Sequence, residues 1–282
     1  MVFVYEPLKF IMLFLKIPNC LLSIILAFRI KKLSNYILNY LFFISFIGWG
    51  IFIGLDGLLY IIAPNGAFLY TLANIFRDVC MIMIALIPLC FIQAGFIIKE
   101  GEEIALHEKK LRLILSFIVS FVISIAMIST DSIIVMDKTA HPPHPFLPDE
   151  LPPTGAFSVS FDPNILANLF YISFVAWYVF GVFLMFFQQR REAGVKRNRT
   201  RYIMFGILMI PIGIVYFIVQ PYIMPLLPVV PGVDPKFVYN LVGQIIWAFS
   251  PILVYIGMRV RVPLESEVPR AKLENEVKAA KP

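Results

Sequence analysis

Seven long apolar runs constrain the fold of this chain more than any other feature. They lie near residues 10–28, 37–63, 68–98, 113–128, 165–187, 202–224 and 237–258. A helix needs about 20 apolar residues to cross about 30 Å of hydrocarbon, and the last six runs approach or exceed that length. Because a bilayer offers no water to backbone groups, such runs form helices, and the alternation typical of a membrane β-barrel is absent. We therefore predict an all-α, polytopic membrane bundle over residues 1–261, followed by a short charged cytoplasmic tail over 262–282.

Composition supports a membrane protein and argues against a water-soluble enzyme. Hydrophobic residues make up 60% of the chain and charged residues 15%, and the mean hydropathy is +0.84. Soluble proteins average about 45–50% apolar and about 25% charged residues. Residues 1–8 carry no basic segment of the kind that opens a signal peptide, so we expect the first run to remain in the mature protein.

The first run is the least regular of the seven, because Lys16 and Pro18 interrupt it. A lysine inside a membrane helix is unfavourable unless its ammonium reaches the interface or pairs with an acid. If this run only lies along the interface, the number of spans becomes six.

Basic residues predict the orientation. Arginine and lysine follow the first, third, fifth and seventh runs, and 19 of the chain's 24 basic residues lie there. Such loops face the cytoplasm, so we predict an outside N-terminus, an inside C-terminus and a multi-pass protein of a cell membrane, most simply a prokaryotic plasma membrane. The basic face would contact anionic headgroups, and it gives no specific indication of nucleic-acid binding.

The longest outer loop spans residues 130–164 and contains seven prolines. This composition favours extended, polyproline-like backbone over helix.

Four charged residues near the membrane form the main candidate site: Lys16, Asp56, Arg77 and Asp78. The second run leads outward and the third inward, so these residues share a depth near the outer face. We predict that Asp56 pairs with Arg77 and that Lys16 lies near Asp78. The cluster would be either the floor of an outward-facing ligand pocket or simply a structural ion pair or interfacial charges in contact with water. The second hypothesis is the simpler one.

Glycines on the second run predict a close helix contact. Gly50 and Gly54 form a small-x-x-x-small pattern, and Gly57 lies nearby. Such a pattern lets two backbones approach. We favour packing within the chain over a dimer interface.

The outer loop also contains His141 and His144, followed by two acidic residues. Their types suit a metal such as zinc, but residues three apart in polyproline geometry are separated by about 9 Å along the axis. We therefore favour a solvated loop.

Recognisable catalytic motifs are absent from the sequence. It contains no Ser/His/Asp arrangement, phosphate loop or HExxH motif, and no lysine for a retinal in the seventh run. The last four runs have no acidic residue in their cores, which argues against a proton relay. The sequence therefore indicates no enzyme and no cofactor.

The order of features resembles the seven-transmembrane sensor module of prokaryotic histidine kinases. The residues that carry this resemblance are the basic turn from Phe28 to Lys32, the Gly48-Trp49-Gly50 stretch and the proline-containing third run around Pro88. The longest outer loop follows the fourth run, and a very basic turn follows the fifth. Because no kinase domain follows Met258, the resemblance implies a stand-alone, non-enzymatic receptor-like or sensor-like protein that signals to a cytoplasmic partner. A small-molecule transporter and an accessory or scaffold subunit of a membrane complex remain alternatives.

Overall fold

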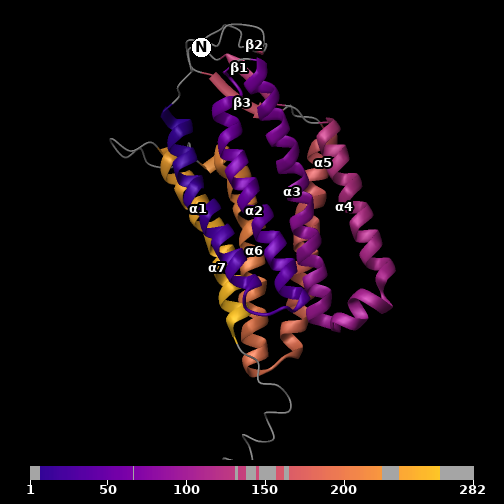
Figure 1. Ribbon diagram of the computed structural model, residues 1–282. Helices are drawn as coiled ribbons and strands as arrows, with labels where there is room; N and C mark the ends of the chain where they lie inside the picture. The colour runs from indigo at the N-terminus through magenta and orange to yellow at the C-terminus, as the bar shows by residue number, and fades with distance from the viewer. Residues whose placement is uncertain are drawn as a thin grey trace, which may run out of the picture.

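The computed structural model describes residues 7–65, 67–130, 133–137, 144–145, 157–161, 165–223 and 235–260. Seven long helices dominate these residues (Figure 1). They are α1 (Pro7–Lys31), α2 (Ile37–Ile62), α3 (Ala67–Glu100), α4 (Lys110–Thr130), α5 (Ile165–Arg191), α6 (Gly194–Ile223) and α7 (Pro235–Arg259). Five of the predicted apolar runs lie inside one of these helices. The other two, 37–63 and 202–224, extend one residue beyond the ends of α2 and α6. A short π-helix, η1 (Ile104–Glu108), joins α3 to α4 and was not predicted.

Five of these helices are long and apolar enough to cross a membrane. The qualifying stretches are Phe10–Lys31, Ile37–Ile62, Ala67–Glu100, Gly194–Phe217 and Val238–Arg259. By length and composition the chain is thus a multi-pass membrane protein.

The helices run side by side, and neighbouring contacts form a closed cycle. In order around the bundle, α1 contacts α2, α2 contacts α3, α3 contacts α5, α5 contacts α6, α6 contacts α7, and α7 returns to α1. The α1 helix is uninterrupted at Pro18 and lies along α2 and α7 (Figure 1). The first run is therefore a member of the bundle.

The centre of this cycle is filled by aromatic side chains. Phe46 of α2 packs against Phe91 of α3, and Trp49 meets Trp247 of α7 edge-on at 5.1 Å between ring centroids. Tyr178 of α5 closes the cluster against Phe91. Large rings fill wide interhelical space, and these are among the most completely buried side chains in the bundle.

Helix α4 lies outside the cycle, against α3 and α5. Its buried positions are Ser116, Ser120 and Ser124, whereas its large apolar residues, such as Phe117 and Phe121, are exposed. This distribution is the reverse of a soluble amphipathic helix. It suits a helix whose outer face contacts lipid and whose small residues allow close helix contact.

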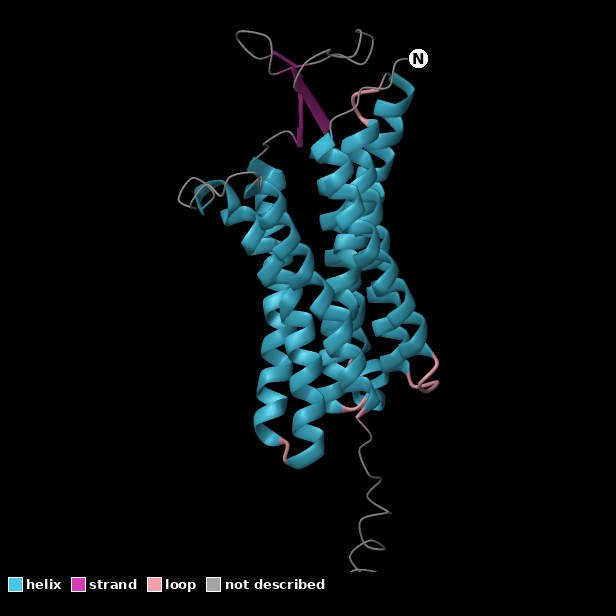
Figure 2. Ribbon diagram, turned by 90° about the vertical axis from the view of Figure 1, so that its left-hand side faces the viewer, coloured by secondary structure: helices cyan, strands magenta, loops and turns pink. Residues whose placement is uncertain are grey.

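A small antiparallel sheet lies beyond one end of the bundle (Figure 2). Its strands are β1 (Ile133–Asp137), β2 (His144–Pro145) and β3 (Phe157–Phe161), in the order β2-β1-β3, with Val135 opposite Val159. We call this the sheet end of the bundle.

The helical bundle confirms the predicted all-α class, whereas the outer loop, predicted to be polyproline-like, contains these three short strands. Residues 133–136 and 157–161 are rich in β-branched and aromatic types, which favour strands. The one proline in a strand, Pro145, lies on the edge strand β2, where a missing N–H is tolerated. The remaining prolines of this loop and the tail over 262–282 lie outside the described residues.

Candidate functional site

The first charged contact at the sheet end joins α1 to α2. Lys16 forms an ion pair with Asp56, and its ammonium also lies 5.3 Å from the centre of the Tyr60 ring. Lys16 is only 7% exposed. Gly57 makes room for it, because a Cβ at position 57 would lie 3.2 Å from Lys16 Cδ. The pair offsets the unfavourable burial of each charge.

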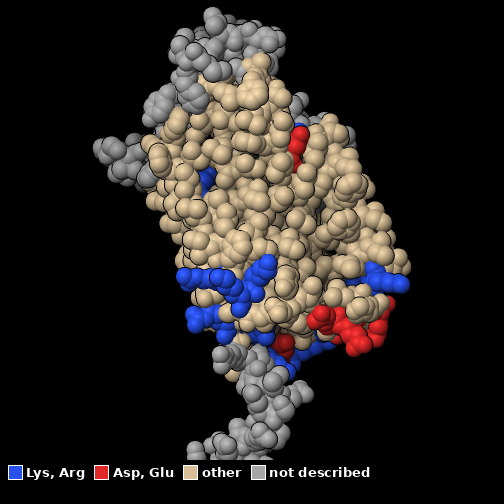
Figure 3. All heavy atoms as spheres, viewed as in Figure 1, with Lys and Arg blue, Asp and Glu red and all other residues tan. Residues whose placement is uncertain are grey.

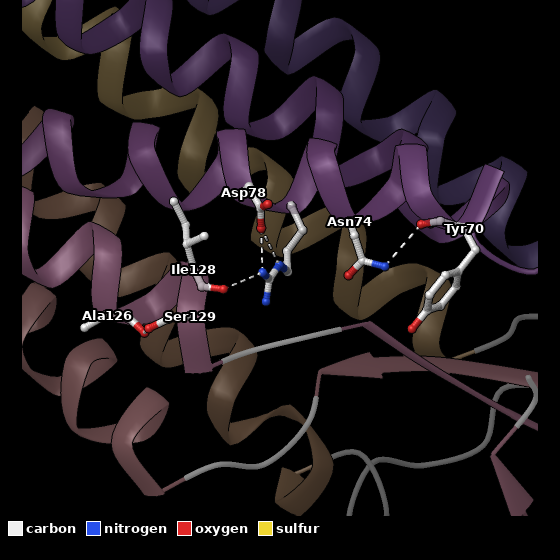
Figure 4. A network of polar contacts seen from close by, with 7 residues as sticks. Tyr70, Asn74, Asp78, Ala126, Ile128 and Ser129 are labelled. Carbon is white, nitrogen blue, oxygen red and sulfur yellow. Dashed lines mark hydrogen bonds and ion pairs between the residues drawn. The ribbon is translucent and has the colours of Figure 1, made fainter. Parts of the chain in front are cut away.

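The second charged contact joins α3 to α4. Arg77 Nε donates to Asp78 Oδ1 at 3.1 Å, and Nη2 donates to the backbone carbonyl of Ile128, also at 3.1 Å (Figure 4). Arg77 is 3% exposed. Its Nη1 has no hydrogen-bond partner among the described residues. The guanidinium therefore holds the last turns of α4 against α3.

The predicted pairing of Asp56 with Arg77 is wrong. Asp56 pairs with Lys16, and Arg77 pairs with its neighbour Asp78. The sequence gives the depth of each residue, but rotation about each helix axis decides which neighbour it faces. The four residues thus form two separate contacts, one on α1–α2 and one on α3–α4. Whether they line a ligand pocket stays a prediction.

The three predicted glycines lie at the α1–α2 contact. An added Cβ at Gly50 would lie 2.8 Å from Ile24 Cγ1, and one at Gly57 would lie 2.9 Å from Leu13 Cδ1. One at Gly54 would meet the Cys20 sulfur at 3.2 Å. These faces are therefore occupied within the chain.

A third charged contact, at the opposite end of the bundle, was not predicted. Glu100 accepts hydrogen bonds from Arg112 Nη1 and Nη2 at 3.2 and 2.8 Å, and it pairs with Lys109 at 3.2 Å. The Arg112 guanidinium also lies 3.5 Å from the centre of the Phe96 ring. Gly101, at φ +91°, ends α3 and lets the chain turn back toward α4. In the sequence these charges were indistinguishable from ordinary loop residues.

The lysines and arginines of the described loops gather at this end (Figure 3), which we call the basic end. Tyr36, in the turn between α1 and α2, lies among them. Burial raises the pKa of its hydroxyl, and the negative charge of Glu102 raises it further, while Arg199 lowers it. Tyr36 is therefore uncharged at neutral pH.

A lateral groove lies near the basic end between α3, α4 and α5. Its volume is about 540 Å³. Its walls are Ile92 and Phe96 of α3, Leu115 and Val119 of α4, and Trp177 and Phe180 of α5, with Lys109 and Arg112 at its edge. The volume falls in the range of small-molecule sites.

Uncharged polar contacts lie deeper in the bundle. Asn19 Nδ2 of α1 donates to Gln244 Oε1 of α7 at 3.1 Å. The contact ties the first helix to the last.

The two predicted metal residues belong to the loop between α4 and α5. His141 lies outside the described residues, and His144 begins β2 with an undescribed side chain. Across the described residues, no group of three or more His, Cys, Asp or Glu is placed to hold a metal ion.

The fold and these contacts define a multi-pass helical membrane protein in which charged side chains join α1 to α2 and join α3 to α4 near both ends of α4. No protein-family model matches the chain, and no curated protein is significantly similar to it in sequence.

Proposed function

We propose that this protein is a non-enzymatic, sensor-like membrane bundle that passes a signal from its sheet end to a cytoplasmic partner at its basic end. In this proposal α4 and α5 complete seven spans. The basic end faces the cytoplasm, since loops rich in lysine and arginine are retained there. The N-terminus then lies outside and the C-terminus inside.

The attachment of α4 is the observation that carries the proposal. Arg77 holds α4 at the sheet end through the Ile128 carbonyl, and Arg112 holds it at the basic end through Glu100. Between these points its contacts are made by a serine face and a partly open groove. A helix held at both ends, and packed between them through small side chains, could slide along its neighbours as one element.

The connections of α4 join the two ends of the molecule. Only two residues separate Thr130, where α4 ends, from Ile133, where β1 begins. At the other end α4 follows η1, and π-helical turns are often found at functional sites. A displacement of the sheet would therefore act first on α4 and, through it, on the basic loops.

Spin-label distances test this relay directly. Labels at Lys110→Cys on α4 and Arg191→Cys on α5, with the native cysteines replaced, report the separation of these exposed positions at the basic end. Arg77→Met removes the hold on α4 at the far end. We expect it to shift or broaden the Lys110–Arg191 distance distribution in lipid.

The matched control is Lys16→Met combined with Asp56→Asn, which removes the other charged contact at the sheet end without touching α4. It is expected to leave the distance distribution unchanged. If Arg77→Met also leaves it unchanged, α4 is not a relay, and an accessory or scaffold role would replace the proposal. If both variants change it equally, the response is general loosening and the proposal is again contradicted.

A further inference from the structure

The lateral groove is an apolar channel on the flank of the bundle. Leu115 and Phe180 on its walls are 52% and 47% exposed, so the groove is accessible from the side that a bilayer would cover. A polar solute cannot form hydrogen bonds with these hydrocarbon walls, whereas the acyl chain of a lipid packs against them favourably.

The edge of the groove at the basic end bears charge. Lys109, Arg112 and Glu100 together carry a formal charge of +1, because two cations share one carboxylate. Arg112 uses Nη1 and Nη2 on Glu100, and its buried Nε–H has no acceptor among the described residues. A phosphodiester group at this edge would supply the balancing negative charge.

Acidic side chains follow immediately beyond these cations. Glu102, Glu103 and Glu108 are exposed on the turn and on η1. Figure 3 shows acidic and basic atoms gathered side by side at this end of the bundle. These carboxylates belong to the turn beyond the ends of α3 and α4, so they lie further along the bundle axis than Arg112 in the first turn of α4.

We propose that the lateral groove binds one hydrocarbon chain of a zwitterionic phospholipid with a primary-amine headgroup, of the phosphatidylethanolamine type. Its phosphate contacts Lys109 and Arg112, and its ammonium lies toward the carboxylates of the turn. A purely anionic lipid would meet the same cations, but it would leave the carboxylates without a positive partner. A choline headgroup is positive but has no N–H to donate to them, whereas a primary ammonium has three. The site depends on membrane insertion and does not depend on a signalling role.

A tryptophan in the groove provides the readout. Trp177 lines the groove, whereas the other two tryptophans, Trp49 and Trp247, are 2% and 7% exposed in the core. The full chain is reconstituted in phosphatidylcholine containing a small fraction of lipid with brominated chains, which quench nearby indole fluorescence. Brominated phosphatidylethanolamine, phosphatidylcholine and phosphatidylglycerol are compared at equal mole fraction.

We expect brominated phosphatidylethanolamine to quench as if its concentration near Trp177 were roughly fivefold higher than that of phosphatidylcholine. That factor corresponds to about 1 kcal/mol, the upper value for a partly exposed ion pair. Equal quenching by all three lipids would mean unselective surrounding lipid and would overturn the proposal. A preference for phosphatidylglycerol would overturn the assigned headgroup.

Matched variants locate the effect. Val119→Phe fills the groove and should abolish the preference, whereas Val122→Phe, on the same helix but outside the groove, should keep it. Lys109→Gln leaves the Arg112–Glu100 pair in place and should weaken the preference, and Trp177→Phe should remove the headgroup-dependent signal. If Val119→Phe retained the preference, the lipid would bind elsewhere. None of these outcomes depends on the relay measured with spin labels, so the two proposals fail separately.

Discussion

Lys16 and Asp56 show how a charge is retained inside an apolar helix. An isolated lysine at this position would oppose membrane insertion of α1, but the ion pair with Asp56 and the neighbouring Tyr60 ring compensate it. Both side chains are mostly buried, at 8% and 18% exposure, so water screens the pair weakly. The contact fixes α1 against α2 at the place where Gly57 leaves room for the lysine stem.

Removing one partner of this pair should destabilise the bundle more than removing both. We expect Lys16→Met to lower the free energy of unfolding by roughly 3 kcal/mol, the low end for breaking a buried ion pair, because Asp56 is left without its counter-ion. The double variant Lys16→Met with Asp56→Asn should recover more than half of that loss. Denaturant unfolding in mixed micelles measures both values. An equal loss in the single and double variants would show that the ion pair contributes little.

At the scale of elements, α6 and α7 interlock through large rings placed over glycines. A Cβ at Gly213 would lie 2.1 Å from Trp247 Nε1, and one at Gly243 would lie 2.3 Å from Phe217 Cζ. Trp247 Nε1 also donates to the carbonyl of Ile210 at 3.3 Å. Each large ring on one helix therefore occupies the space above a glycine on the other.

Gly213→Ala should disrupt this pair. The new methyl group would displace the Trp247 ring, and overpacking of this kind costs about 1–3 kcal/mol. The thermal unfolding temperature in detergent should fall accordingly. Gly48→Ala is the control, since its Cβ would meet Met83 Sδ at 3.4 Å, an ordinary contact, and the variant should unfold near the parent temperature. A Gly213→Ala protein as stable as Gly48→Ala would contradict the interlocking.

For the whole molecule, the distribution of charge determines the expected orientation. The basic residues of the described loops lie at one end, and the sheet lies at the other (Figures 2 and 3). With seven spans, His107 on η1 would face the cytoplasm and Ser129 near the end of α4 would face outward. Both side chains are exposed.

Cysteine labelling tests this orientation. In a chain with its native cysteines replaced, we expect a membrane-impermeant maleimide to label Ser129→Cys in intact cells and His107→Cys only after permeabilisation. This result follows from retention of basic loops in the cytoplasm. The reverse pattern would invert the bundle, and labelling of both positions from one side would mean that α4 does not cross the membrane.

The positions of the helices could be predicted from the sequence, but most of the contacts between them could not. Hydropathy is a local property, so even the irregular run around Lys16 and Pro18 could be placed in a helix. The Gly50–Gly54 spacing could be recognised because the two residues are one turn apart on the same helix. Gly213 and Gly243 could not, because their meaning depends on rings from another helix.

The sequence by itself thus determined where the seven long helices lie along the chain, the apolar character of the chain and the grouping of its basic residues. The tertiary structure decided that Lys16 pairs with Asp56, that Arg77 turns to α4, that α4 lies outside the helix cycle and that the loop after it contains strands. The physical reason is that membrane insertion depends on the composition of each segment alone. Pairing depends on the rotation of each helix about its axis, which only the packing of all the helices together can set.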